Sequence, residues 1–278
     1  MIAPGGFSTA RVSGSAWATV LARVYMALFL LVAILREHRR QREVQPRVPF
    51  RFDPGRIRRL GALGVPAASQ VTLEVGVFAA VSALAGRLDP VSLGSHQIAL
   101  NIAALAFMVP LGLSSAVAVR VGHVVGARDA HRAVREGWTA LAAGVAIMAI
   151  VGATLFLFPV PLLRVFTNDP RVIDIGVRLL AIAGAFQVFD GTQAVATGVL
   201  RGIGDTRTPM IMNVIGHWVL GLPVGYVLCF GRGWGVIGLW IGLSIGLVFV
   251  AVVLTIIWHR RTARFQLPEH APALPDLL

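Results

Sequence analysis

Two acidic residues lie near the middle of apolar stretches and are the best candidates for chemistry in this sequence. Glu74 is the only ionisable residue in the stretch 63–84, and Asp190 is the only one in the stretch 179–200. A carboxylate at membrane depth is costly unless a partner compensates for it, so such residues usually face a protein interior or a water-filled cavity. We interpret the two acids as one site. The alternative for each is a structural carboxylate that hydrogen-bonds a neighbouring helix.

Amide side chains accompany both acids at helical spacing. The candidate cation- and substrate-binding residues are Glu74, Asp190, Gln70, Gln97, Asn101, Gln187 and Gln193. Residues three or four positions apart share a helix face, which places Gln70 with Glu74 and both Gln187 and Gln193 with Asp190. We therefore expect a hydrated cavity that both acids face. Any one of these amides could instead hydrogen-bond across helices.

The composition indicates a membrane protein with several spans. The chain has 278 residues, of which 56% are hydrophobic and 14% charged, with a mean hydropathy of +0.76. Soluble domains carry about 25% charged residues. The net charge of +12 does not indicate nucleic acid as a partner, because the 25 basic residues, all arginine, lie in short segments between apolar runs. A single cysteine, Cys229, excludes a disulfide framework and a cysteine-ligated metal site.

Seven apolar segments satisfy the requirement of about 20 residues for a membrane-spanning helix. They are 16–35, 60–86, 91–119, 138–163, 179–200, 208–231 and 233–258. Backbone groups in lipid must be hydrogen-bonded internally, so the predicted fold is all-α, with about seven transmembrane helices. The predicted organisation is an N-terminal tail and first helix (1–35), a basic linker (36–59), a compact six-helix lobe (60–260) and a disordered tail (261–278).

The arginines predict the orientation in the membrane. Eighteen lie in the linker 36–59, the connectors 120–137 and 201–207, and the tail after Trp258, whereas six lie on the opposite side. Basic residues are enriched in cytoplasmic segments, so the C-terminus is predicted to be cytoplasmic. With seven spans the N-terminus is then outside, yet the first residues do not form a signal peptide. We therefore expect further residues before Met1 in the intact protein.

No enzymatic motif is found in the sequence. The patterns His-Glu-x-x-His, Gly-x-Ser-x-Gly and Gly-x-x-x-x-Gly-Lys are all missing. The chain is therefore predicted not to be an enzyme, to need no cofactor other than a coupling ion, and not to be driven by ATP.

Three groups of segments resemble a known family. They are 95–114 with 120–122 and 126–129; 64–66 with Glu74 and Phe78; and 189–209. In this order they resemble the eighth helix with its following loop, the seventh helix, and the tenth helix with its following loop of the multidrug and toxin extrusion (MATE) family, NorM type. The resemblance covers about residues 16–260.

The resemblance implies a fold, a function and partners. Members of this family have two six-helix lobes joined by a cytoplasmic linker, and this chain corresponds to helix six, the linker and the C-terminal lobe. The family exports cationic and amphipathic compounds from the cell through the inner (plasma) membrane in exchange for sodium ions or protons. Its acids in helices seven and ten contribute to the cation site, so the resemblance implies that Glu74 and Asp190 hold the coupling cation, sodium being the metal ion considered. Phe186 stands where some members have a tyrosine, so the sequence offers no hydroxyl there.

The length of the chain limits this implication. A single lobe would need the missing N-terminal lobe or a second copy as a partner within the lipid bilayer, so we expect a truncated half that does not transport alone. The alternatives are a lipid-linked oligosaccharide flippase of the same superfamily and an inactive membrane fragment or scaffold. A flippase groove is expected to be rich in basic residues, and the spans contain only Arg23.

Overall fold

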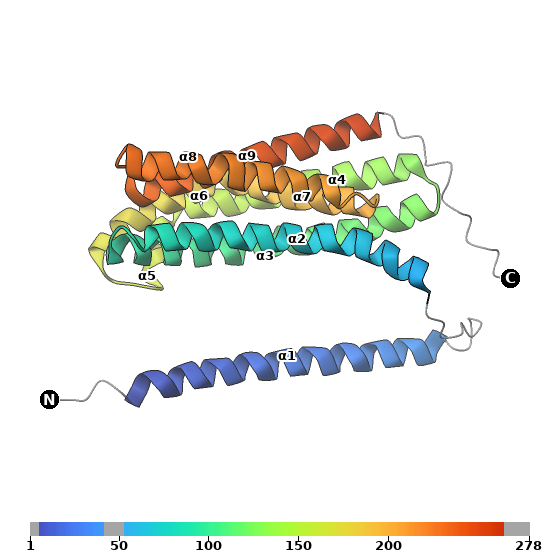
Figure 1. The fold of residues 1–278 in the computed structure, drawn as a ribbon, viewed down its shortest axis with the longest axis horizontal. Helices are drawn as coiled ribbons and strands as arrows, with labels where there is room; N and C mark the ends of the chain where they lie inside the picture. The colour runs from blue at the N-terminus through green and yellow to red at the C-terminus, as the bar shows by residue number, and fades with distance from the viewer. Residues whose placement is uncertain (1–5, 42–52, 264–278) are drawn as a thin grey trace. The chain divides into compact units, whose positions relative to one another are not determined.

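The computed structural model describes residues 6–41 and 53–263, which are almost entirely helical (Figure 1). Residues 42–52 of the predicted linker and 264–278 of the predicted disordered tail lie outside the described residues. The chain divides into two compact units, Met1–Pro54 and Gly55–Leu278. Seven helices in the described parts are long and apolar enough to cross a membrane, which confirms the predicted number.

The first unit contains one helix, α1 (Gly6–Gln41). Its segment Trp17–Arg36 meets the length and composition of a membrane span and coincides with the predicted span 16–35. The helix continues beyond that segment, so the first residues of the predicted linker 36–59 are helical.

The second unit is a bundle of long helices. It contains α2 (Pro54–Ala85), α3 (Pro90–Gly126), α4 (Ala130–Leu157), α5 (Pro159–Arg164), α6 (Pro170–Gly202) and α9 (Gly235–Thr262). Between α6 and α9, one span is composed of α7 (Arg207–Asn213), the π-helical η1 (Val214–Gly221), α8 (Leu222–Tyr226) and the π-helical η2 (Val227–Gly231). An aspartate caps the N-termini of α3, α4 and α6, and in α3 and α6 a proline follows it at the first helical position.

Two of the predicted spans differ from the structure in their continuity. The span predicted over 138–163 is divided at Phe158, where α4 ends and the short α5 begins. Pro159 explains the division, because a proline disfavours helical geometry in the residue before it. The span predicted over 208–231 is interrupted by η1 and η2, between which Pro223 lies. Proline removes a backbone donor and clashes with the carbonyl four residues earlier, a conflict that local widening of the helix relieves.

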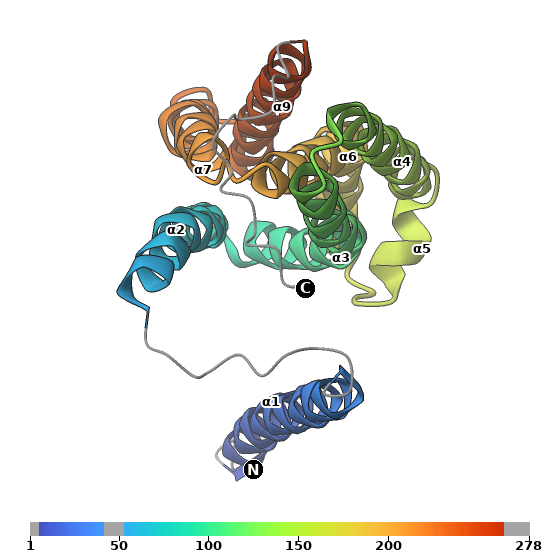
Figure 2. The ribbon, with the colours of Figure 1, turned by 90° about the vertical axis from the view of Figure 1, so that its right-hand side faces the viewer.

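Helix α6 is the central helix of the bundle, packed against α3, α4 and α9 (Figure 2). Glycines allow its close approach to its neighbours. A Cβ atom at Gly184 would lie 2.8 Å from the carbonyl oxygen of Gly152 in α4, and one at Gly198 would overlap the backbone of Ser114 in α3. At the second contact the Ser114 hydroxyl donates to the carbonyl oxygen of Ala194 over 2.7 Å. These contacts fix the rotation of α6, and with it the direction of its polar face.

One end of the bundle carries most of its arginines. The start of α2, the α3–α4 turn, the α6–α7 turn and the end of α9 all lie at this end (Figure 1). Arg120 donates to Glu136 over 2.6 Å and ties α3 to α4. Arg261 of α9 lies 2.5 Å from Asp205 in the α6–α7 turn. We call this end the arginine end.

Candidate functional site

The two predicted acids lie together in the bundle and share one donor. The Gln193 side-chain nitrogen Nε2 donates to Glu74 Oε1 over 3.2 Å and makes a longer contact of 3.5 Å with Asp190 Oδ1. Glu74 comes from α2, while Asp190 and Gln193 lie one turn apart on α6. Sequence separation between Glu74 and Gln193 is 119 residues, so this pairing is a product of the fold.

Contacts beside Glu74 hold α2 in place. The indole nitrogen of Trp218 in η1 donates to the carbonyl oxygen of Leu73 over 3.0 Å. Gly76 makes room for this ring, since a Cβ atom there would lie 3.2 Å from Trp218. The π-helical segment therefore contacts α2 on both sides of Glu74. Such segments often occur at functional sites.

Beside Asp190, helix α6 packs closely against α4. The neighbouring Gly191 lies against Met148 of α4, with no room for a side chain. Asp190 itself is 9% exposed and Gln193 is 2% exposed. One turn before Asp190, the buried Phe186 contacts the ring of Trp240, with centroids 6.0 Å apart. This aromatic pair makes the surroundings of Asp190 apolar on that side.

The arrangement is suited to a cation. Two carboxylates that share a single amide donor repel each other unless a proton, a metal ion or an organic cation neutralises the pair. A further acceptor is present, because Gln193 Oε1 is buried without a hydrogen-bond partner among the described residues. Carboxylate and amide oxygens are the donors that hard cations prefer. Among the described residues, no group of three His, Cys, Asp or Glu side chains could hold a metal ion.

A positive charge lies on the same face of α6. Arg201 is half-buried near the end of this helix, eleven residues after Asp190. Neither Arg201 nor Thr197, which lies between it and Gln193, was included in the predicted site. Their spacing of four and eight residues from Gln193 is the sequence signal that could have identified both.

The other predicted binding residues lie in different surroundings. Gln70 is 5% exposed and lies one turn from Glu74, as its spacing predicts. Gln187 is fully buried, and its Cβ packs toward Gly152 of α4. Gln97 and Asn101 are exposed on α3, and no hydrogen bond in the described parts joins them to either acid. The structure thus brings Glu74, Asp190 and Gln193 together, while cation or substrate binding by these three and by the other residues stays a prediction.

His96 lies beside Gln97 in the sequence but belongs to a buried hydrogen-bond chain. Trp240 of α9 donates to His96 Nδ1 over 3.0 Å, and His96 Nε2 lies 2.8 Å from the Ser82 hydroxyl of α2. Because Nδ1 of His96 accepts a hydrogen bond, Nε2 carries the ring proton and donates to the Ser82 hydroxyl. The Ser82 hydroxyl in turn donates to the carbonyl oxygen of Phe78. This chain of hydrogen bonds joins α9, α3 and α2 about two turns after Glu74.

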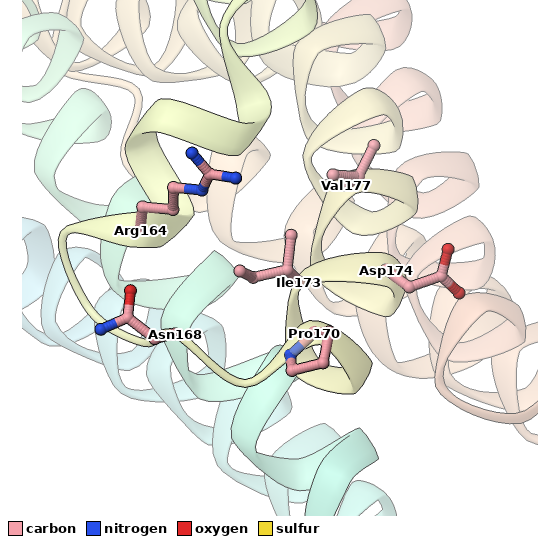
Figure 3. A pocket seen from close by; sticks show the side chains of 6 residues that line it. All are labelled: Arg164, Asn168, Pro170, Ile173, Asp174 and Val177. Carbon is pink, nitrogen blue, oxygen red and sulfur yellow. The ribbon is translucent and has the colours of Figure 1, made fainter.

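A pocket of about 560 Å³ lies elsewhere on the bundle, where α5 leads into α6 (Figure 3). Its lining residues are Arg164, Asn168, Pro170, Ile173, Asp174 and Val177. None of these residues belongs to the predicted site. Asp174, moreover, pairs with Arg178 at 3.0 Å on the exposed surface of α6.

Comparisons with known proteins agree with this architecture. A family model described as MatE matches residues 66–227. The chain is 42% identical over 261 residues to a probable multidrug resistance protein NorM of Mesorhizobium japonicum, covering 92% of this chain and 56% of that protein. It is 40% identical to the corresponding protein of Brucella suis, with 93% and 56% covered. The chain therefore spans about half the length of the curated relatives it matches.

A solved structure shows the same fold. The crystal structure of MATE in the bent conformation aligns with a TM-score of 0.79 at 20% identity, over 90% of this chain and 55% of that one. At that identity the likeness concerns the fold alone.

Proposed function

This chain belongs to the MatE family, and on that premise we propose that it supplies one lobe of a cation-coupled exporter. The proposed substrates are cationic or amphipathic small molecules, exchanged for sodium ions or protons. The observation that carries the proposal is the Gln193 amide between Glu74 and Asp190, which joins two carboxylates into one site inside a membrane-spanning bundle.

The proposed mechanism follows from competition for these carboxylates. A bare carboxylate pair in an apolar interior is penalised, so the site is stable when a proton, a sodium ion or a cationic substrate occupies it. Substrate and coupling cation then exclude each other, and release of one requires arrival of the other. In a two-lobed transporter, rocking of one lobe against the other would expose the site alternately to the two sides.

We extend the proposal to the organisation of the chain. Residues 60–260 form the six-helix lobe, preceded by a span and a basic cytoplasmic linker, and the arginine end faces the cytoplasm. The partner that completes the path is an N-terminal lobe or a second copy. The single lobe already contains both acids, so cation binding can be measured on this chain alone.

The test is binding of a fluorescent cation, ethidium, to the purified chain in lipid nanodiscs. Glu74→Gln and Asp190→Asn should each weaken binding about tenfold or more, the effect of losing one charged partner of about 1.5–3 kcal/mol. Asp174→Asn is the matched control, because Asp174 is an exposed carboxylate on the same helix as Asp190. Sodium or acid should displace the dye from the wild type.

Three outcomes are decisive. Equal affinity in all variants would contradict binding at the acid pair. Binding that neither sodium nor protons displace would contradict the competition. Dye transport by proteoliposomes containing this chain alone, driven by an imposed gradient and lost in Asp190→Asn, would show that one lobe is sufficient.

A further inference from the structure

We infer that one face of α6 holds a short row of bound water that connects the acid pair with the arginine end of the bundle, and that Thr197 is its central protein group. The inference deepens the proposed function, because it assigns the route by which a proton or hydrated cation reaches Glu74 and Asp190.

The face in question changes character at Asp190. Toward the start of α6 it presents Leu179, Ala183 and Phe186, which are all buried and apolar. Toward the arginine end it presents Asp190, Gln193, Thr197 and Arg201. The spacings of three and four residues place all seven on one side of the helix. The acid pair thus has an apolar barrier on one side and polar groups on the other.

Thr197 differs from most of the hydroxyl residues in these helices. Eight of them donate to the carbonyl oxygen four residues earlier: Thr72, Ser82, Ser95, Ser115, Thr154, Thr192, Ser244 and Thr255. Thr197 is only 4% exposed, and its hydroxyl has no hydrogen-bond partner among the described residues. An unpaired buried hydroxyl is costly in proteins, so it requires a partner such as water.

The neighbouring unpaired acceptor lies one turn away. Gln193 Oε1 is also buried without a partner among the described residues. Positions four residues apart on a helix are separated by about 6 Å along its axis. One water molecule with two hydrogen bonds of about 2.8 Å bridges that separation. Buried water in proteins typically occupies such polar places, where it makes two to four hydrogen bonds.

Arg201 forms the outer end of the row. It lies eleven residues after Asp190, about 17 Å along the helix, where α6 approaches the bundle end. A guanidinium group at this place provides several donors to water.

The test measures hydrogen–deuterium exchange of the carboxyl groups of Glu74 and Asp190. The purified chain is reconstituted in lipid, acidified so that both groups are protonated, and transferred to D2O while the infrared C=O band is followed. Glu74→Gln and Asp190→Asn assign the band. Thr197→Val preserves shape and removes the hydroxyl, and Thr192→Val removes a hydroxyl that bonds Val188 on another face of α6.

We expect Thr197→Val to slow exchange about tenfold, equivalent to about 1.4 kcal/mol in the barrier. Thr192→Val should exchange as the wild type does, and Thr197→Ser should restore the rate. If Thr197→Val exchanges as fast as Thr192→Val, or if Thr197→Ser is as slow as Thr197→Val, the inference is wrong.

Two further points keep the result interpretable. If the valine variant does not fold, judged by size-exclusion chromatography and helicity, Thr197→Ala is compared with Thr197→Ser under the same expectation. The measurement needs neither substrate nor gradient. Failure of dye binding would therefore reject the proposed function without touching this inference, and unaltered exchange would reject the inference without touching dye binding.

Discussion

At the scale of single residues, one amide determines how two carboxylates coexist. Gln193 can donate through Nε2 to both acids, whereas a hydrocarbon at this position would leave the half-buried Glu74 and the buried Asp190 without a shared donor. The remaining oxygen of this amide adds a third acceptor to the pair. In the proposed function this side chain therefore both bridges the acids and contributes to cation binding.

This role predicts different effects for two buried glutamines of α6. Gln193→Leu should weaken ethidium binding about tenfold, because one charge-assisted hydrogen bond is lost. Gln187→Leu should leave binding unchanged and stability equal or higher, because both amide atoms of Gln187 are buried without a partner in the described parts. Fluorescence titration and thermal unfolding in the same detergent measure the two effects. Equal losses of affinity would mean that Gln193 acts only through packing.

Asp89 gives a second residue-scale prediction, at the surface turn before α3. It accepts the Ser92 hydroxyl over 2.6 Å and the Ser92 backbone N–H over 2.9 Å. These two bonds, the hydroxyl first, lower the pKa of Asp89. A lowered folded pKa means that the stabilisation is present above the unfolded value of about 3.9 and is lost as the pH falls through the folded value.

The comparison is wild type against Asp89→Asn, since asparagine caps a helix but does not titrate. Their difference in unfolding temperature should be constant above about pH 5 and change below about pH 4. Other carboxyl groups titrate equally in both proteins and cancel. A difference that stays constant through the acid range would contradict a titrating cap.

At the scale of elements, most of what the membrane dictates could be predicted from the sequence. The number of spans follows from length and apolarity, and the pairing of Glu74 with Asp190 follows from the cost of isolated charges in lipid. Close packing of the last span depends on its glycines, since a Cβ atom at Gly238 would lie 2.7 Å from the Cys229 backbone nitrogen.

What the sequence did not indicate depends on helix rotation and on long-range contacts. Gln97 and His96 are adjacent on α3, yet the first is exposed and the second is buried against Trp240 and Ser82. Apolar residues surround both in the sequence, so the hydrophobic periodicity does not indicate which face of helix α3 is buried. Gln187, like Gln193, lies three residues from Asp190, but it packs toward α4. Pro159 could have indicated the helix break at Phe158, but the apolar run over 138–163 is uninterrupted and gave no other sign of it.

The α8–α9 contact yields a prediction for these elements. A Cβ atom at Gly242 would overlap the backbone of Gly225 and Gly221. Gly242→Ala should therefore destabilise the bundle by about 1–3 kcal/mol through overpacking. Gly61→Ala is the matched control, because nothing lies within 4 Å of a Cβ atom at that position. Thermal unfolding in detergent measures both, and similar unfolding temperatures for the two variants would contradict backbone contact at Gly242.

At the scale of the whole molecule, the arrangement of charge and the site belong together. The row from Asp190 to Arg201 leads toward the end where Arg120, Arg261 and their acidic partners lie. If that end is cytoplasmic, the proposed water row supplies the acid pair from inside the cell. The apolar face from Leu179 to Phe186 then separates the same pair from the outside. The orientation of the chain therefore decides which side the route serves.

The orientation can be tested with single cysteines in a Cys229→Ala background, the natural cysteine being buried. Cysteines replacing Arg87 and Arg232, both exposed at the end opposite the arginine end, should react with a membrane-impermeant maleimide on intact cells. A cysteine replacing His131, exposed at the arginine end, should react only after permeabilisation. The reason is the bias of 18 arginines to six, since basic segments are retained in the cytoplasm. Labelling of position 131 on intact cells, with positions 87 and 232 protected, would reverse the orientation. The proposed row would then open to the outside.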